Sequence, residues 1–281
     1  MRKYVPFALL AALVPAAASS QGGIDWNAAF PPHRIIDNLY FVGTEALGTF
    51  LVATPDGHIL VNSDFEATVP VIRENVEALG FDFGDIEIVL GSHAHGDHME
   101  ADALVKQLTG AEVMAMAEDV PALRQMRPGG KEHPIDRVLH DGDEVSLGGT
   151  TLTAHLTPGH TKGCTSWGLE VEENGERYQA LIVCSFGVND NYVLVGNSGY
   201  PEIADDYRAT FAKARELPVD VFLGSHGFFY DMAAKHERLV DRAPGDPNPF
   251  VDREGYLAHV DAQERRFLEM LAAQQRNTSA P

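Results

Sequence analysis

The sequence predicts an α/β protein in which two β-sheets pack against each other and are covered by helices. Short apolar runs separated by turn residues fill the N-terminal part, and strand-like and helix-like segments alternate after it. The second half repeats this order of strands and helices. Strands in both halves with interspersed helices are typical of two packed sheets flanked by helical layers. The 281 residues, 44% of them hydrophobic, are enough to bury a large core.

The N-terminal part of the predicted domain is rich in β-structure. Residues 39–43, 49–54 and 58–62 are short apolar runs separated by turn residues, among them Pro55-Asp56-Gly57. Such closely spaced strands predict an antiparallel edge of a sheet. Residues 69–79 then place apolar side chains every three or four positions, which predicts a helix.

Strands and helices alternate through the rest of the chain. No low-complexity linker or break in composition divides residues 21–281, so we expect a single domain over that range. Apolar runs bounded by turn residues indicate the strands, and helical spacing of apolar residues indicates the helices. The expected strands are residues 86–90, 113–116, 152–156 and 219–223, and the expected helices are residues 101–108, 120–126, 207–216 and 253–274.

The charge of the chain argues against nucleic acid as a partner. Its 21 lysines and arginines stand against 41 acidic residues, which gives a formal charge of −20. A charge of that sign repels phosphate backbones. We interpret the acidic surface as a solubility feature rather than a means of steering a cationic ligand, and we expect a monomer that acts on a small molecule.

The first twenty residues are typical of a secretory signal. Arg2 and Lys3 precede an apolar run over residues 4–14, and a stretch of small residues follows it. The apolar run is too short to span a bilayer, and no other segment is long enough to do so. We therefore predict a signal peptide over residues 1–20, a periplasmic or secreted location, and no membrane span in the mature form.

Two cysteines flank a predicted hairpin. Asn174-Gly175 is a strong turn signal between two alternating strand-like runs. When the strands pair about that turn, Cys164 and Cys184 lie one residue out of register with each other. A bulge or a slightly longer loop would bring the two thiols within disulfide reach. Free buried thiols and zinc ligation by either cysteine are the alternatives.

Three apolar strands end in a loop of small residues that carries a histidine. They read Ile-Val-Leu-Gly-Ser-His93, His-Leu-Thr-Pro-Gly-His160 and Phe-Leu-Gly-Ser-His226. Rigid scaffolds often place functional side chains on loops at strand ends. One histidine in such a setting is usually a surface or core residue, but three in the same setting indicate a shared site. The remaining histidines lack that setting, and we expect most of them at the surface.

The motif His-x-His-x-Asp-His, which begins at His93, predicts two metal ions. It places four metal-competent side chains within six residues. Zinc prefers four ligands, and a catalytic zinc keeps one position open, so the motif offers more ligands than one ion takes from one loop. In an extended loop His93 and His95 point to the same side. The glycine that follows lets the chain turn, so that Asp97 and His98 can serve a second ion.

These motifs resemble the metallo-β-lactamase superfamily along essentially the whole mature chain. The similar residues are the His-x-His-x-Asp-His motif, Thr157-Pro-Gly-His160-Thr161 and Gly224-Ser-His226. Among the branches the chain is most similar to subclass B3 β-lactamases, through Gly43-Thr-Glu, Val61-Asn-Ser-Asp, His160-Thr-Lys-Gly-Cys164, and Asn197 followed by Tyr200-Pro201. The resemblance implies a four-layer αβ/βα sandwich of two mixed sheets flanked by helices, with the metals at one edge.

The resemblance also implies a cofactor of two zinc ions and a β-lactam substrate. Water bound to zinc can have its pKa lowered to about 7, which provides a hydroxide nucleophile at neutral pH. The implied reaction is hydrolysis of the β-lactam amide bond by this metal-bound hydroxide, an activity that confers antibiotic resistance. The implied ligands are His93, His95 and His160 for one zinc, and Asp97, His98 and His226 for the other.

The residue that follows the predicted strand at 180–184 separates branches of the superfamily. Relatives that hydrolyse thioesters, phosphodiesters or lactones usually carry an aspartate there that bridges both metals, whereas this chain has Ser185. The first two lactamase subclasses carry a cysteine ligand there, but Cys184 is one residue away and its side chain is expected to point the opposite way. The serine resembles subclass B3, and Cys184 as a zinc ligand is the alternative.

Three residues are candidates for contact with the substrate or the attacking water. Asp97 is the candidate catalytic residue, because it would orient the water and could shuttle its proton. Ser185 and Asn189 are candidates to hold the substrate carboxylate, although a solvated loop is the alternative for Asn189. Hydrolysis of another ester, thioester or lactone is the second candidate function, and non-catalytic zinc binding is the third.

Overall fold

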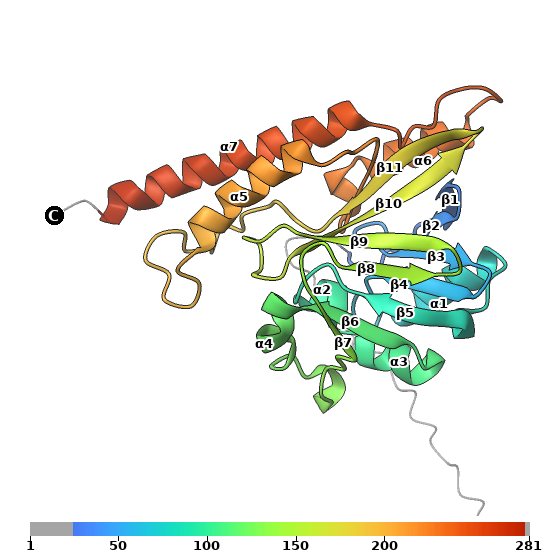
Figure 1. Ribbon diagram of the computed structural model, residues 1–281, viewed down its shortest axis with the longest axis horizontal. Helices are drawn as coiled ribbons and strands as arrows, with labels where there is room; N and C mark the ends of the chain where they lie inside the picture. Colours follow the sequence, from blue (N-terminus) through green and yellow to red (C-terminus); the bar gives the residue numbers. More distant parts are fainter. Residues whose placement is uncertain (1–24, 279–281) are drawn as a thin grey trace, which may run out of the picture.

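The computed structural model describes residues 25–278, which form two β-sheets packed together with helices on their outer sides (Figure 1). The predicted signal peptide, residues 1–20, lies outside the described residues. Within the described part of the chain, no helix combines the length and the apolar character that a bilayer span requires.

The first sheet contains seven strands in the order β1-β2-β3-β4-β5-β6-β7. Strands β1 to β4 pair antiparallel, and the sequence predicts this arrangement for β2 to β4. Strands β4 to β7 pair parallel, because helical segments cross over between them. The strands are β1 (His33–Ile36), β2 (Leu39–Phe41), β3 (Phe50–Thr54), β4 (Gly57–Val61), β5 (Ile86–Leu90), β6 (Glu112–Met116) and β7 (Arg137–Leu139).

The second sheet contains five strands in the order β12-β11-β10-β9-β8. All pairs are antiparallel except β11 and β12, which are parallel. Because β9 and β11 both pair antiparallel with β10, strands β9, β11 and β12 run in one direction and end at the same edge of the sheet. The strands are β8 (Glu144–Leu147), β9 (Thr150–Leu156), β10 (Thr165–Glu173), β11 (Glu176–Val183) and β12 (Val221–Gly224).

Helices cover the outer face of each sheet, which produces the four layers of an αβ/βα sandwich (Figure 1). In β3, Phe50 and Val52 join the core between the sheets, whereas Leu51 joins a separate core with side chains of α1 and α3. Helices α5 and α7 pack on each other over the second sheet. The predicted fold class is therefore confirmed. The helices are α1 (Val69–Ala78), α2 (Gly96–Met99), α3 (Asp102–Thr109), α4 (Val120–Leu123), α5 (Ile203–Glu216), α6 (Met232–Val240) and α7 (Arg253–Thr278).

The hairpin of β10 and β11 has the predicted register. Trp167 pairs with Ile182, and the turn residues Asn174 and Gly175 both have positive φ angles, of 55° and 82°. Positive φ at both central positions is the geometry for which Asn-Gly is favoured. Cys164 and Cys184 lie just beyond the paired residues and form a disulfide with a Cα–Cα distance of 5.8 Å. The two cysteines are one residue out of register, but they lie outside the hydrogen-bonded strand pair, so the chain can bring their sulfur atoms together.

Several elements differ from their predicted limits. Helix α5 begins at Ile203 rather than at residue 207, and α7 extends to Thr278 instead of residue 274. The helix predicted over residues 120–126 is confined to α4, because the chain turns away after Arg124. Strands β1, β7 and β8 and helix α6 were not predicted.

Candidate metal centre

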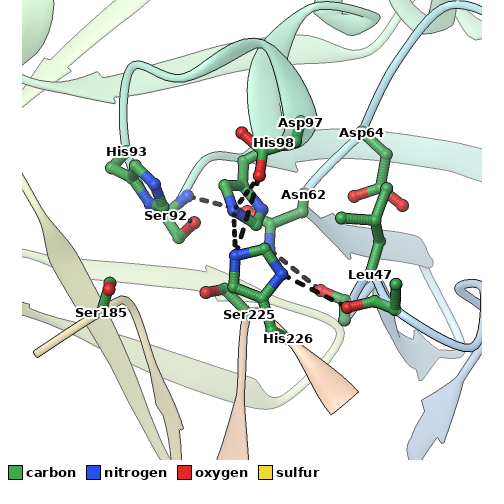
Figure 2. Close-up of polar contacts among 12 residues, drawn as sticks. Leu47, Asn62, Asp64, Ser92, His93, Asp97, His98, Ser185, Ser225 and His226 are labelled. Carbon is green, nitrogen blue, oxygen red and sulfur yellow. Dashed lines mark hydrogen bonds and ion pairs between the residues drawn. The ribbon is translucent and has the colours of Figure 1, made fainter. Parts of the chain in front are cut away.

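Loops that follow strands of both sheets meet at one edge of the sandwich. The loop after β5 carries His93, and in the second sheet the loops after β9, β11 and β12 carry His160, Ser185 and His226. Figure 2 shows Asp97, His98 and His226 with their side chains turned toward one another. The six predicted metal ligands are thus brought together as two groups of three, within which the potential ligand atoms lie within 4.8 Å of one another.

The first group consists of His93, His95 and His160. Their ring centroids are 4.7 to 4.9 Å apart. The Nδ1 atom of His160 lies 2.8 Å from the carbonyl oxygen of Gly187. A carbonyl only accepts hydrogen bonds, so Nδ1 carries the proton and Nε2 keeps its lone pair for a metal. The Nε2 atom of His93 is buried and has no hydrogen-bond partner among the described residues, as expected of a ligand atom.

The second group consists of Asp97, His98 and His226. The Nε2 atoms of His98 and His226 lie 3.2 Å apart, and the Oδ2 atom of Asp97 lies 3.3 Å and 3.7 Å from them. Zinc bonds of about 2.0–2.1 Å in a tetrahedron place neighbouring ligand atoms roughly 3.3 Å apart. The Nδ1 atom of His226 lies 3.3 Å from the carbonyl oxygen of Ala46, which leaves the lone pair of Nε2 available to a metal. This donor set could hold one zinc ion.

Burial keeps the imidazoles of His93, His98, His160 and His226 neutral. It lowers the pKa of His160 and of His226 to about 3 each, mainly through desolvation. Desolvation, together with the neighbouring imidazoles, also holds the pKa values of His93 and His98 well below the usual value. A neutral imidazole offers the lone pair that a metal requires. Five clustered nitrogen bases and one carboxylate therefore form a site suited to divalent cations.

The disulfide removes both cysteines from the list of possible ligands. The Sγ atom of Cys184 lies 3.4 Å from Nδ1 of His93, the ring atom on the side away from the predicted metal position. That sulfur is bonded to Cys164 and carries no thiolate charge. The alternative in which Cys184 binds zinc therefore does not fit the structure, and the hairpin cysteines instead pack behind a candidate ligand.

Asp119 is a supporting residue that the sequence analysis missed. Its carboxylate accepts hydrogen bonds from the backbone nitrogen atoms of Ala94 and Gly163, at 2.8 and 2.7 Å, and from Oγ1 of Thr161, at 2.8 Å. It therefore joins the loop of His93 and His95 to the loop after His160. Burial raises the pKa of Asp119, whereas these hydrogen bonds lower it. A Cβ atom on Gly163 would lie 2.6 Å from the backbone nitrogen of Asp119, so only glycine fits there.

The turn after β4 holds the loop after β5 through hydrogen bonds. Asn62 accepts a hydrogen bond from the backbone nitrogen of Ser92, at 2.9 Å, and donates one to the carbonyl of Gly48. The carbonyl of His98 accepts hydrogen bonds from the backbone of this turn. Asp64 is fully buried, which raises its pKa to about 8, and Thr49 donates a hydrogen bond to it. Asn62 and Asp64 belong to the Val61-Asn-Ser-Asp motif, whose structural role was not apparent from the sequence.

A cleft of about 930 Å³ opens in front of the two ligand groups. Ser185 and Asn189 line it, so the structure places both predicted substrate contacts beside the ligands. The ring of Phe228 stacks on that of His226 with centroids 4.9 Å apart, and Trp26 lies at 5.8 Å from the same ring. Among the described residues that line the cleft, none is a lysine or arginine.

The other histidines do not join the site, but several are buried instead of exposed. His33, His58 and His133 are each less than 9% exposed, so the expectation of surface positions is wrong for them. His133 lies 3.0 Å from Asp102 as a buried ion pair, and this pairing raises its pKa against the effect of desolvation. Such tertiary partners leave no mark in the local sequence.

Comparisons with known proteins agree with this geometry. The family model of the metallo-beta-lactamase superfamily matches residues 49–174. The structure is similar to that of the FEZ-1 metallo-beta-lactamase from Legionella gormanii, with 43% sequence identity, a TM-score of 0.85, and coverage of 89% of this chain and 98% of that chain. It is also similar to BJP-1, a subclass B3 metallo-beta-lactamase of Bradyrhizobium japonicum, with 38% identity, a TM-score of 0.83, and coverage of 90% and 98%.

Curated relatives carry a different activity. A hydroxyacylglutathione hydrolase from Methylococcus capsulatus is 32% identical over 121 residues, which are 43% of this chain and 42% of that protein. One from Rhodospirillum rubrum is 35% identical over 125 residues, which are 44% and 40% of the two chains. The chain thus spans less than half of the length of these relatives. From the six converging side chains, the sandwich fold and the nearly full-length structural matches, we conclude that the chain belongs to the metallo-β-lactamase superfamily and has subclass B3 enzymes among its structural neighbours.

Proposed function

We propose that the protein is a zinc-dependent hydrolase that opens the β-lactam amide bond. The observation that carries this proposal is the position after β11. Ser185 stands there, and Asp97 is the only carboxylate in the two ligand groups found among the described residues. Hydrolases of this superfamily that act on thioesters, phosphodiesters or lactones usually have a bridging carboxylate there. The matches to lactamase structures, which cover about nine-tenths of the chain, support the same choice.

The residues of the cleft suit a compact anionic amide. Zinc, when bound, supplies a water of lowered pKa as nucleophile and stabilises developing negative charge. The hydroxyl of Ser185 accepts a hydrogen bond from the backbone nitrogen of Gly187, at 3.2 Å, so its own proton is available to a substrate carboxylate. The amide of Asn189 is a second donor, and Trp26 and Phe228 offer apolar faces to substituents on the ring. The carboxylate of Asp97 is the group that can take up a proton at this edge of the cleft.

A glutathione thioester is the second candidate substrate. The similarity to hydroxyacylglutathione hydrolases favours it. Glutathione presents two carboxylates, and recognition of carboxylates commonly uses arginine or lysine. The described residues that line this cleft include neither. That absence weighs more against glutathione, with its two carboxylates, than against a β-lactam, whose single carboxylate Ser185 and Asn189 can hold.

The test is a steady-state comparison on one zinc-loaded preparation. We expect turnover of nitrocefin, a penicillin and a carbapenem far above that of free zinc, and turnover of S-lactoylglutathione at least 100-fold lower in kcat/KM. Chelation should abolish the activity and zinc should restore it. Rates on all three β-lactams no higher than with free zinc would reject the proposal, and efficient thioester cleavage in the same assay would select the second candidate. Tight zinc binding without turnover of any substrate would favour a non-catalytic zinc protein.

The location, domain organisation and oligomeric state of the protein are also part of the proposal. We propose export with removal of residues 1–20, a single domain over residues 21–281, and a monomer with two zinc ions. The disulfide between Cys164 and Cys184 supports export, because disulfides persist in oxidising compartments. N-terminal sequencing of protein from the periplasm or medium should begin near residue 21, and light scattering of the mature protein should give the mass of one chain.

A further inference from the structure

The loop that carries Ser185 and Asn189 is held by the backbone to the C-terminal helix. The side-chain amide of Gln274, on α7, donates from Nε2 to the carbonyl of Tyr192 at 2.7 Å. Its Oε1 atom accepts from the backbone nitrogen of Leu194, also at 2.7 Å. One side chain thus pairs with a donor and an acceptor of the loop, as a neighbouring strand would.

A second contact lies two turns earlier on the same face of α7. Nε of Arg266 donates to the carbonyl of Val188 at 3.2 Å, and its Nη2 donates to Oδ1 of Asp190 at 2.5 Å. Residues eight apart share one face of a helix and lie about 12 Å apart along its axis. Arg266 and Gln274 therefore hold both ends of residues 188–194.

The same loop contacts a candidate metal ligand from its other side. The carbonyl of Gly187 accepts hydrogen bonds from Nδ1 of His160 and from the hydroxyl of Tyr207, at 2.8 and 2.7 Å. The hydroxyl of Tyr192 donates to the carbonyl of His160 at 2.8 Å. Gln274 thus binds the backbone of the residue whose side chain reaches His160.

We propose that Gln274 is a positioning residue, which fixes the loop at residues 185–194 so that Ser185 and Asn189 face the ligand groups in a binding-competent geometry. Ordering a loop before the substrate arrives reduces the entropy lost on binding. The metal ligands do not depend on this contact alone, because they are anchored by β5, β9 and β12 and by Asp119. Loss of Gln274 should therefore weaken substrate binding more than metal binding.

The experiment compares Gln274→Ala with Glu269→Ala, a substitution at an exposed position of the same helix. In Gln274→Ala we expect amide hydrogen exchange across residues 186–194 to quicken about ten-fold. We expect KM for nitrocefin to rise about five-fold or more, with kcat changed less than two-fold and two zinc ions retained. Arg266→Ala should quicken exchange mainly at residues 188–190, and Glu269→Ala should match the wild type in every measurement.

Two results would overturn the proposal. One is unchanged exchange over residues 186–194 in Gln274→Ala, and the other is an equal loss of zinc and of kcat with unchanged KM. The KM readout rests on the proposed function, but the exchange readout does not. If the wild type fails to hydrolyse any β-lactam, the proposed function fails, while the exchange comparison still decides whether Gln274 orders the loop.

Discussion

The Nε2 atoms of His98 and His226 lie 3.2 Å apart, although His98 follows a strand of the first sheet and His226 a strand of the second. Both imidazoles are neutral because burial lowers the pKa of each, to about 3 for His226. When both Nε2 atoms carry lone pairs, as metal binding requires, a cation between them would remove the repulsion between the two rings. The nearby carboxylate of Asp97 completes the set that such a cation requires.

Replacing Asp97 by asparagine should remove one of the two zinc ions that we propose. The amide keeps the size of the side chain but loses the negative charge beside His98 and His226. We expect zinc content to fall from two ions to one per chain and kcat/KM for nitrocefin to fall at least about 100-fold. Elemental analysis and kinetics on the same sample measure both. The control is Asp56→Asn in the exposed turn before β4, and retention of two tightly bound ions in Asp97→Asn would contradict this assignment.

Asp119→Ala should weaken metal binding without touching a metal ligand. The substitution leaves the nitrogens of Ala94 and Gly163 and the hydroxyl of Thr161 without their acceptor, so the two ligand loops lose their link. We expect zinc affinity, measured by competition with a chromogenic chelator, to fall about 10–100-fold. Glu118→Gln, at the preceding position, is the matched control. An unchanged affinity in Asp119→Ala would show that the loops hold their positions independently.

Removal of the disulfide should destabilise the fold. Cys164 and Cys184 close a loop with a sequence separation of 20 residues, and the double substitution to alanine should lower the free energy of unfolding by about 3 kcal/mol. Urea unfolding at neutral pH measures the difference. Reduction of the wild type should produce a similar shift, and equal stability of the oxidised and reduced forms would be inconsistent with a structural role for the bridge.

His259 should make the protein sensitive to acid. Burial among aromatic rings lowers its pKa to about 4, and its Nε2 atom has no hydrogen-bond partner among the described residues. Between pH 6.5 and 4 the unfolded chain binds a proton that the folded chain does not, so the free energy of unfolding falls as the pH falls, by about 1.4 kcal/mol per pH unit. Urea unfolding at pH 5 and 7 should show a smaller difference for His259→Leu. The same substitution at exposed His140 should leave the difference as in the wild type, and no change in His259→Leu would contradict a neutral buried ring.

The features predicted from sequence are those encoded locally. Asn174-Gly175 determines the hairpin register because both positions need a positive φ, and few other pairs accept it. The convergence of the six candidate ligands was predictable because four of them lie within six residues, and the other two follow strands that end in a loop of small residues. The apolar run of β3 and the helical spacing in α1 marked these elements, and the order of such strands and helices in both halves predicted the layers.

The features that were missed depend on tertiary partners. Strand β7 has three residues, of which Arg137 and Val138 are exposed, so no apolar run marks it. Helix α6 follows Asp231, which has a φ of 56° and offers no side-chain cap, so the usual signal for a helix start is absent. The role of Asp119 arises only when the loops around residues 94 and 163 meet. Nothing near these residues in sequence reports such contacts.

Each ligand group draws two side chains from the first sheet and one from the second: His93 and His95 are joined by His160, and Asp97 and His98 by His226. An ion bound to either group would act as a clamp between the two halves of the sandwich. Any separation of the halves would break that coordination, so zinc affinity and the docking of the sheets are thermodynamically linked. Zinc depletion should consequently weaken the packing between the two sheets. A substitution that weakens this packing far from the cleft should, in turn, lower the affinity for zinc.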